Sequence, residues 1–289
     1  MGILGLWPLL KNKGYEATLS DQRQVLSATS DPTTRVLIDV LGGILSTIRR
    51  AYSTSPLDRA HVVAELKLRE LADPSNGILY LDGSLAAEKM LTNQGREDKR
   101  EKAPKVVDKC TTQLMARVTE KLHVQKQQFH KIRKHLDRSF YWSVASRQAF
   151  AQYCRSKGWT VIECTTEADI RIANDCGTHD VVISTDSDML VYKTVSRIWR
   201  PISKGRFLQY KVSEVLDSLQ ITRTQLTALG IVSRNDYNHN MVMAVGLGQL
   251  SSSSRLSSLH ETFMAFFVQK VSILCQSYVV AARCLTFLY

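Results

Sequence analysis

The sequence predicts an α/β fold with a mainly parallel central sheet, and three observations support this prediction. Short runs rich in Val, Ile and Leu recur at 36–39, 78–82 and 181–185, and such runs are typical of buried parallel strands. Segments with a helical pattern separate these runs, so strands and helices alternate as in βαβ units. The chain has 289 residues, 44% of them hydrophobic, which is enough to bury a sizeable core.

The predicted elements follow in order along the chain. In the first part we expect a strand at Val36–Asp39, helices at Leu41–Tyr52 and Ala60–Leu71, and a strand at Ile78–Asp82. The second part predicts a helix at 147–157, a strand at 160–163, a helix at 167–174, a strand at 181–185, two short strands at 196–201 and 206–210, and helices at 212–219 and 224–231.

A strongly basic segment interrupts this alternation between residues 89 and 138. It carries 14 Lys or Arg and 6 Asp or Glu, and so holds +8 of the chain's formal net charge of +11. We expect one or more long, exposed helices here. A solvated helical surface with ion pairs would explain part of this composition, but a charge excess of this size favours contact with nucleic acid.

Cysteine spacing and hydropathy argue against two other classes of protein. The six cysteines form no CxxC pair, so their spacing does not indicate a zinc site and fits buried thiols in a reducing compartment. The apolar amino terminus lacks the basic region and cleavage site of a signal peptide. The apolar tail at 262–289 is interrupted by Lys270 and Arg283, which leave 12 residues between them, fewer than the ~20 that span a bilayer. We therefore expect no membrane association.

Each of the three apolar runs ends at aspartate. Asp39 and Asp82 close the first two runs, and Asp186 and Asp188 follow the third. Because ligands of open α/β sheets bind beyond the carboxyl ends of the strands, these four carboxylates are expected at one edge of the sheet. Like charges that lie close together repel unless a cation holds them, and a divalent metal is the simplest candidate.

Further acidic residues extend this pattern. Glu167 and Asp169 stand two residues apart at the start of a predicted helix, and Asp236 follows the last predicted helix. Each acid also has a purely structural interpretation, as a helix cap or as part of a polar turn. The residues taken singly leave both interpretations open.

Four segments, in one order, carry a family resemblance: MGILGLWPLL at the amino terminus, TEADIRIA from 166, VVISTDSDMLVY from 181 and LTALGIVSRNDY from 226. In these segments the chain resembles the flap endonuclease/XPG family of structure-specific 5′ nucleases, and the resemblance runs from Met1 to about Gly248. It implies a PIN-like, three-layer α/β/α fold with a helical arch inserted in the basic segment.

The resemblance also implies a set of metal ligands. The seven acidic ligands of the family correspond here to Asp39, Asp82, Glu167, Asp169, Asp186, Asp188 and Asp236. They would hold two Mg²⁺ ions, for which Mn²⁺ can substitute. Magnesium prefers oxygen ligands, and two metals ~3.5–4 Å apart can stabilise both the attacking and the leaving oxygen in phosphodiester hydrolysis.

Two cations complete the implied site. Lys89 and Arg96 lie seven and fourteen residues after Asp82, so about two helical turns separate them and they share a helix face. Family members carry a Lys and an Arg at these places, at the base of the arch, where both contact the scissile phosphate. The alternative is a chance match in a segment so rich in cations.

The combined prediction is a metal-dependent 5′ nuclease that acts on DNA with a flap, junction or end, in repair or replication. Residues 1–248 would form the nuclease domain, with an amino-terminal part at 1–100, the arch at about 89–140 and the internal part at about 145–240, and 249–289 would form a divergent helical tail. We expect a monomer, placed in the nucleus if the cell is eukaryotic and otherwise intracellular. A non-catalytic nucleic-acid-binding relative and a PIN-type ribonuclease acting on RNA are the alternatives.

Overall fold

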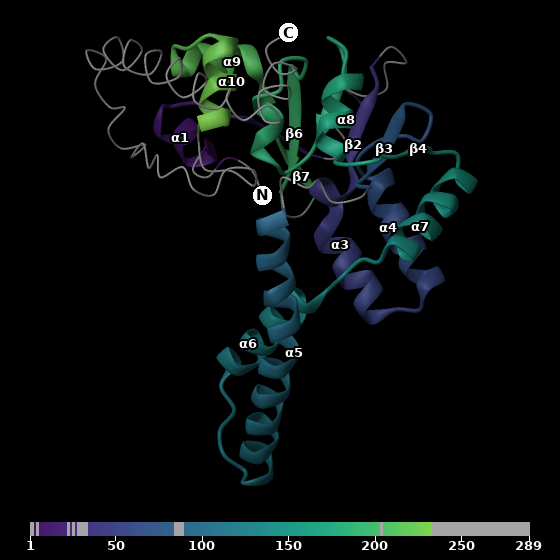
Figure 1. Cartoon of the computed structure of the whole chain (residues 1–289), viewed down its shortest axis with the longest axis vertical. Helices are drawn as coiled ribbons and strands as arrows, with labels where there is room; N and C mark the ends of the chain where they lie inside the picture. Colours follow the sequence, from purple (N-terminus) through teal and green to yellow (C-terminus); the bar gives the residue numbers. More distant parts are fainter. Residues whose placement is uncertain are drawn as a thin grey trace. The chain divides into compact units, whose positions relative to one another are not determined.

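The structure is a computed structural model of the whole chain, and it describes residues 3, 6–21, 24, 27, 34–83, 90–202 and 205–232 (Figure 1). The chain divides into two compact units. The first comprises Met1–Leu37 and Asp169–Tyr289, and the second comprises Ile38–Ala168. The boundary between Leu37 and Ile38 falls within the strand Val36–Asp39.

The described elements alternate between helix and strand, as the sequence predicts. The elements up to the basic segment are α1 (Leu6–Asn12), β1 (Thr18–Asp21), β2 (Val36–Asp39), α3 (Val40–Thr54), α4 (Leu57–Arg69) and β3 (Gly77–Leu81). Then follow α5 (Met90–Thr119), α6 (Lys126–Ser139), α7 (Val144–Ser156), β4 (Thr160–Glu163) and α8 (Ala168–Asp175). The remaining elements are β5 (Val181–Ile183), the 3₁₀ turn η2 (Ser187–Leu190), β6 (Arg197–Pro201), β7 (Arg206–Lys211), α9 (Val212–Leu219) and α10 (Arg223–Val232).

The strands form one mixed sheet in the order β1-β7-β6-β5-β2-β3-β4. In the first unit β5 and β6 are parallel, while β7 pairs antiparallel with both β6 and β1. In the second unit β3 and β4 are parallel. The expected α/β fold with a central sheet is confirmed, and the antiparallel strands at one edge are a common addition to parallel sheets.

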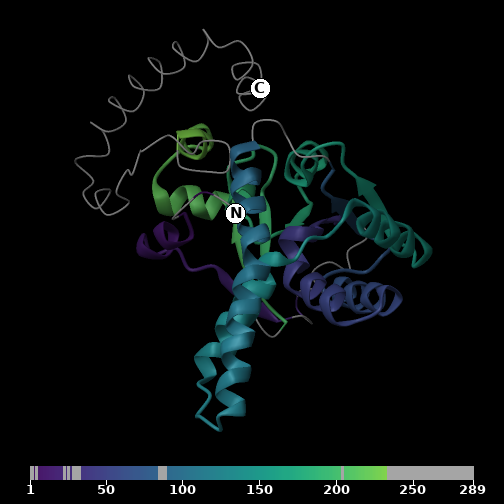
Figure 2. The same ribbon diagram turned by 60° about the horizontal axis from the view of Figure 1, so that its bottom comes forward.

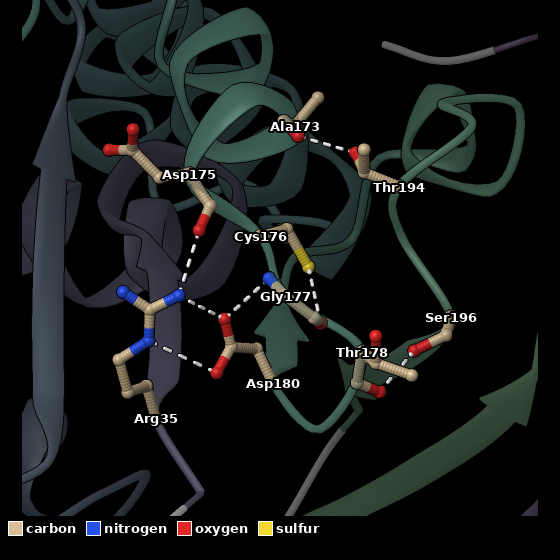
Figure 3. A network of polar contacts seen from close by, with 9 residues as sticks. All are labelled: Arg35, Ala173, Asp175, Cys176, Gly177, Thr178, Asp180, Thr194 and Ser196. Atoms are coloured by element: carbon tan, nitrogen blue, oxygen red, sulfur yellow. Dashed lines mark hydrogen bonds and ion pairs between the residues drawn. The ribbon is translucent and has the colours of Figure 1, made fainter.

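An ion pair joins the beginnings of β2 and β5 in the first unit (Figure 3). Arg35 donates from Nε and Nη2 to the two carboxylate oxygens of Asp180, at 3.1 and 2.5 Å, and from Nη2 to the carbonyl oxygen of Asp175. The amide of Gly177 also donates to Asp180, at 2.6 Å. Burial alone would raise the pKa of the Asp180 carboxyl, but these hydrogen bonds and the guanidinium charge lower that pKa below its usual value.

The second unit packs α3, α4 and α7 around an aromatic cluster. The ring of His61 lies 5.4–5.9 Å from the rings of Tyr52, Phe150 and Tyr153. His61 is 5% exposed, and burial lowers the pKa of its imidazole, an effect only partly offset by the negative charge of Asp58.

The basic segment forms the helical pair α5 and α6, which lie side by side (Figures 1 and 2). Lys121 adopts a left-handed conformation (φ 56°) just after α5, as residues beyond a helix end often do. Gln125 and Gln128 then form a reciprocal capping box that begins α6. Nine Lys or Arg side chains of the two helices are exposed: Lys99, Lys102, Lys105, Lys109, Lys126, Lys131, Arg133, Lys134 and Arg138. Lys121, between the two helices, is exposed as well.

The predicted boundaries agree closely with the structure. The strand at Thr160–Glu163 and the helix at Val212–Leu219 have the predicted limits, and the long basic helices are confirmed as α5 and α6. Helix α1, strand β1 and the turn η2 were not predicted. The tail predicted at 249–289 lies outside the described residues. Within the described part of the chain, no helix combines the length and apolar character that crossing a bilayer requires.

Candidate active site

The predicted strand-end aspartates stand at the carboxyl ends of their strands. Asp39 is the last residue of β2, and Asp82 directly follows β3. Asp186 and Asp188 lie three and five residues beyond the end of β5. Each therefore occupies the position where α/β sheets bind ligands.

Asp39 also caps a helix. Its Oδ1 accepts a hydrogen bond of 2.8 Å from the amide of Gly42, in the first turn of α3. Asp39 is 8% exposed. The bond satisfies one of the unpaired amides at the helix start and fixes the orientation of the carboxylate.

Asp82 is held by the segment that carries Glu167. Its Oδ1 accepts a hydrogen bond of 2.8 Å from the amide of Ala168, the first residue of α8. Arg147, on α7, donates from Nη1 to the carbonyl oxygen of Asp82, also at 2.8 Å. The side chain and the backbone of Asp82 are thus both bound within the second unit, and Glu167 is placed next to this contact by the chain itself.

Gly83 makes this close approach possible. Its amide donates to the carbonyl oxygen of Thr166 at 2.6 Å. A Cβ atom added at Gly83 would lie only 1.9 Å from the carbonyl oxygen of Cys164. The residue after Asp82 must therefore lack a side chain.

Asp169 and Asp186 are oriented by hydrogen bonds within the first unit. Asp169 Oδ2 accepts from the hydroxyl of Tyr192 at 3.0 Å, and its Oδ1 accepts from the amide of Ile170. Asp186 Oδ1 accepts from the amide of Asp188 at 3.1 Å, which caps η2. Asp186 therefore has the turn-forming role that its structural interpretation predicts.

The amino terminus approaches this loop. Ser187, which lies between two of the predicted ligands, donates from its hydroxyl to the carbonyl oxygen of Ile3 at 3.3 Å. Both residues are buried. Ile3, in the amino-terminal segment that carries part of the family resemblance, thus contacts the loop that holds Asp186 and Asp188.

Comparison with known proteins identifies part of the chain. Residues 158–236 match the family model for the XPG I-region. These residues are therefore similar to an XPG I-region. The match spans the elements from β4 to α10 and includes five of the seven predicted ligands: Glu167, Asp169, Asp186, Asp188 and Asp236. The resemblance to the flap endonuclease/XPG family is thereby confirmed. No curated protein matches the sequence of the chain.

Two solved structures share the fold. Human GEN1 in complex with Holliday junction DNA aligns with a TM-score of 0.52 and 14% identity, over 99% of this chain and 66% of that one. The catalytic core of Rad2 in complex with a DNA substrate aligns with a TM-score of 0.52 and 14% identity, over 87% of this chain and 69% of that one. The chain thus spans about two thirds of each. At this identity the likeness establishes the fold alone.

The donor set of the I-region and the strand ends suits a hard divalent cation. All seven predicted ligands are carboxylates, the ligand type that magnesium prefers. Carboxylates that bind metal are themselves commonly held by hydrogen bonds, as Asp39, Asp82, Asp169 and Asp186 are.

The structure does not by itself assemble a metal site. Among the residues it describes, no group of three or more His, Cys, Asp or Glu side chains is arranged to hold a metal ion. Asp236 and Lys89 lie outside the described residues. Asp39, Asp82 and Glu167 belong to one unit, and Asp169, Asp186 and Asp188 to the other. Their convergence, and the pairing of Lys89 with the half-buried Arg96 of α5, stay predictions.

The structure adds residues that the sequence did not single out. Arg147 and Gly83 position Asp82, and Tyr192 positions Asp169. The glycine after a strand-end aspartate was the one visible signal, because such a glycine often marks a close backbone approach. The hydroxyl of Tyr192 gave no signal, since it stands in an apolar run typical of a buried core.

Proposed function

We propose that the chain is a structure-specific nuclease that hydrolyses phosphodiesters of DNA carrying a 5′ flap, junction or end. The observation that carries this proposal is the XPG I-region at 158–236, whose acidic residues accompany hydrogen-bonded aspartates at the carboxyl ends of β2, β3 and β5.

The chemistry would require two magnesium ions bound by the seven carboxylates. When bound, these ions supply a nucleophilic water at neutral pH and stabilise charge on the leaving oxygen. The contribution of the protein is orientation. Backbone amides hold Asp39, Asp82 and Asp186, and a tyrosine hydroxyl holds Asp169, so the ligands need little reorganisation when substrate arrives.

The positive charge of the chain would serve the nucleic acid. Arg96 and Lys89 would hold the scissile phosphate, as cations do for transferring phosphoryl groups. The ten exposed cations of α5, α6 and the turn between them would contact the phosphate backbone, and binding should then weaken steeply as salt rises. We further propose that the protein acts as a monomer, in the nucleus where the cell has one.

The test is cleavage of a labelled 5′-flap DNA by the wild type and by Asp186→Asn, with Mg²⁺ or with EDTA. Asparagine keeps an oxygen that can cap η2 but removes the charge that a metal needs. We expect cleavage by the wild type only with Mg²⁺, and a loss of at least about a hundredfold in the variant. Asp217→Asn, at an exposed position of α9, serves as the matched control and should cleave normally.

Two results would contradict the proposal. Full activity of Asp186→Asn would remove the active-site assignment, and a wild type that binds the flap without cutting it would indicate a non-catalytic relative. An RNA flap of the same shape tests the ribonuclease alternative, because the 2′-OH is what distinguishes the two substrates.

A further inference from the structure

Helix α10 binds the backbone of the segment that follows the Asp186–Asp188 loop. The guanidinium of Arg223, at the start of α10, donates to three carbonyl oxygens: those of Leu190, Tyr192 and Val195. The distances to Leu190 and Val195 are 3.0 and 2.6 Å. Burial lowers the pKa of this guanidinium to about 10. Burying a cation is costly, and the three carbonyl oxygens offset this cost by accepting hydrogen bonds from the guanidinium. The same bonds hold the backbone of residues 190–195 against the start of α10.

Two further residues of α10 contact the same segment. Thr227 donates from its hydroxyl to the carbonyl oxygen of Val191 at 2.8 Å. A Cβ atom added at Gly230 would lie 2.9 Å from a methyl group of Val191, so the helix is packed against that side chain without room for a larger residue. Arg223, Thr227 and Gly230 are spaced by four and three residues, and they therefore form one face of α10.

The segment held by this face carries Tyr192, which is 5% exposed. The hydroxyl of Tyr192 lies 3.0 Å from Oδ2 of Asp169. An ionised carboxylate only accepts hydrogen bonds, so the tyrosine donates. Asp169 Oδ1 accepts from the amide of Ile170 at 2.9 Å. Both oxygens of Asp169 are thus engaged in directional bonds, and the rotation of the carboxylate is fixed.

We propose that Tyr192 is a positioning residue for Asp169, and that the Arg223, Thr227 and Gly230 face of α10 holds Tyr192 in place for this task. The hydroxyl sets the orientation of the carboxylate before a divalent cation binds. The inference rests on the metal-dependent function proposed above, since Asp169 must be a ligand for its orientation to matter. Partners of this kind typically change metal affinity by about 10–100-fold.

The direct test measures metal binding without DNA. Mn²⁺ also favours oxygen ligands, and electron paramagnetic resonance counts its free ions. Tyr192→Phe keeps the buried ring and removes only the hydroxyl, so we expect an unchanged fold and Mn²⁺ binding weakened by about tenfold. In cleavage of the 5′ flap, the Mg²⁺ concentration for half-maximal rate should rise by the same factor while the KM for DNA stays unchanged.

Tyr15→Phe is the matched control. It also removes one hydroxyl from the first unit. That hydroxyl accepts a hydrogen bond of 3.3 Å from the amide of Lys211, and Lys211 is not a predicted metal ligand. We expect this variant to bind Mn²⁺ as the wild type does.

A double-mutant cycle decides whether Tyr192 acts through Asp169. If it does, adding Tyr192→Phe to Asp169→Asn should cause almost no further loss of Mn²⁺ binding. A further tenfold loss in the double variant would overturn the proposal, and so would normal Mn²⁺ binding by Tyr192→Phe. A Tyr192→Phe protein that does not fold would also overturn it, by showing that the hydroxyl serves the fold.

The two proposals fail in different ways. A wild type that neither binds Mn²⁺ nor cleaves the flap contradicts the proposed function. A wild type that does both, with Tyr192→Phe indistinguishable from it, contradicts only the role of Tyr192.

Discussion

Replacing Gly83 by alanine should damage both the stability of the second unit and the orientation of Asp82. The new Cβ atom would start 1.9 Å from the backbone oxygen of Cys164, whereas real Cβ atoms essentially never approach closer than 3.0 Å. The two backbone segments must therefore separate by about 1.1 Å. A backbone oxygen cannot rotate away as the end of a flexible side chain can.

That separation would break two hydrogen bonds. They are the bond of 2.6 Å from Gly83 to Thr166 and the bond of 2.8 Å from the Ala168 amide to the Asp82 carboxylate. A backbone bond contributes about 1 kcal/mol and one to a charged group about 1.5–3 kcal/mol. Allowing for partial relaxation, we expect the free energy of unfolding to fall by about 3 kcal/mol. Because Asp82 is a predicted metal ligand, we expect a displacement of this size to lower the cleavage rate by about a hundredfold.

The assay pairs urea unfolding, followed by circular dichroism, with cleavage of the 5′ flap. Gly95→Ala is the matched control, because a Cβ atom at Gly95 has no atom within 4 Å. Gly95 lies inside α5, where alanine is the better helix former by about 1 kcal/mol, so this variant should be as stable as the wild type or more so. If Gly83→Ala unfolded and cleaved like the wild type, the close approach of the two segments would be refuted.

Two further predictions concern stability and pH. Burial lowers the pKa of His61 below its usual 6.5, so the folded state binds fewer protons than the unfolded state, and the stability that is complete above pH 6.5 is lost as the pH falls below it. His61→Phe should therefore flatten the decline of the urea midpoint between pH 7.5 and 5.5. An equally steep decline in the variant would contradict the assignment to His61. The pKa of Asp180 is also lowered, from a usual value of 3.8, so its ion pair with Arg35 stabilises the fold above that pH and is lost as the pH falls through the folded-state value. Asp180→Asn should reduce the free energy of unfolding at pH 7 by about 1–2 kcal/mol, and the gap between wild type and variant should narrow below pH 4. A gap that does not change with pH would show that the charge of Asp180 is not the cause.

Local patterns in the sequence predict most of the fold because they report on burial and on helix ends. The run at Val181–Ile183 is fully buried in β5, and its composition alone indicates a strand. The strand β1 was missed for the opposite reason. Its burial pattern shows one buried residue in four, and its place in the sheet comes from pairing with β7, nearly 190 residues away. No local pattern can reveal such a partner.

The candidate site shows the same contrast between features that are local in the sequence and partners that are distant in it. The types and order of the acids could be predicted from the sequence, since carboxylates that follow apolar strands form a local pattern. The partners that orient them could not. The amide that binds Asp82 is 86 residues away, and the hydroxyl that binds Asp169 is 23 residues away. The predicted ligands can therefore be found without the fold, but their positioning residues cannot.

The structure also bears on the choice between capping acids and metal ligands, which the sequence left open. Asp39 and Asp186 do cap helical turns, through Oδ1 in each case. A carboxylate has two oxygens with about four acceptor sites, so a capping bond does not prevent a metal bond. The cap in fact favours one, because it fixes the carboxylate at the end of its strand before any cation arrives. The capping roles of Asp39 and Asp186 are thus compatible with the ligand roles predicted for them, and the two interpretations do not exclude each other.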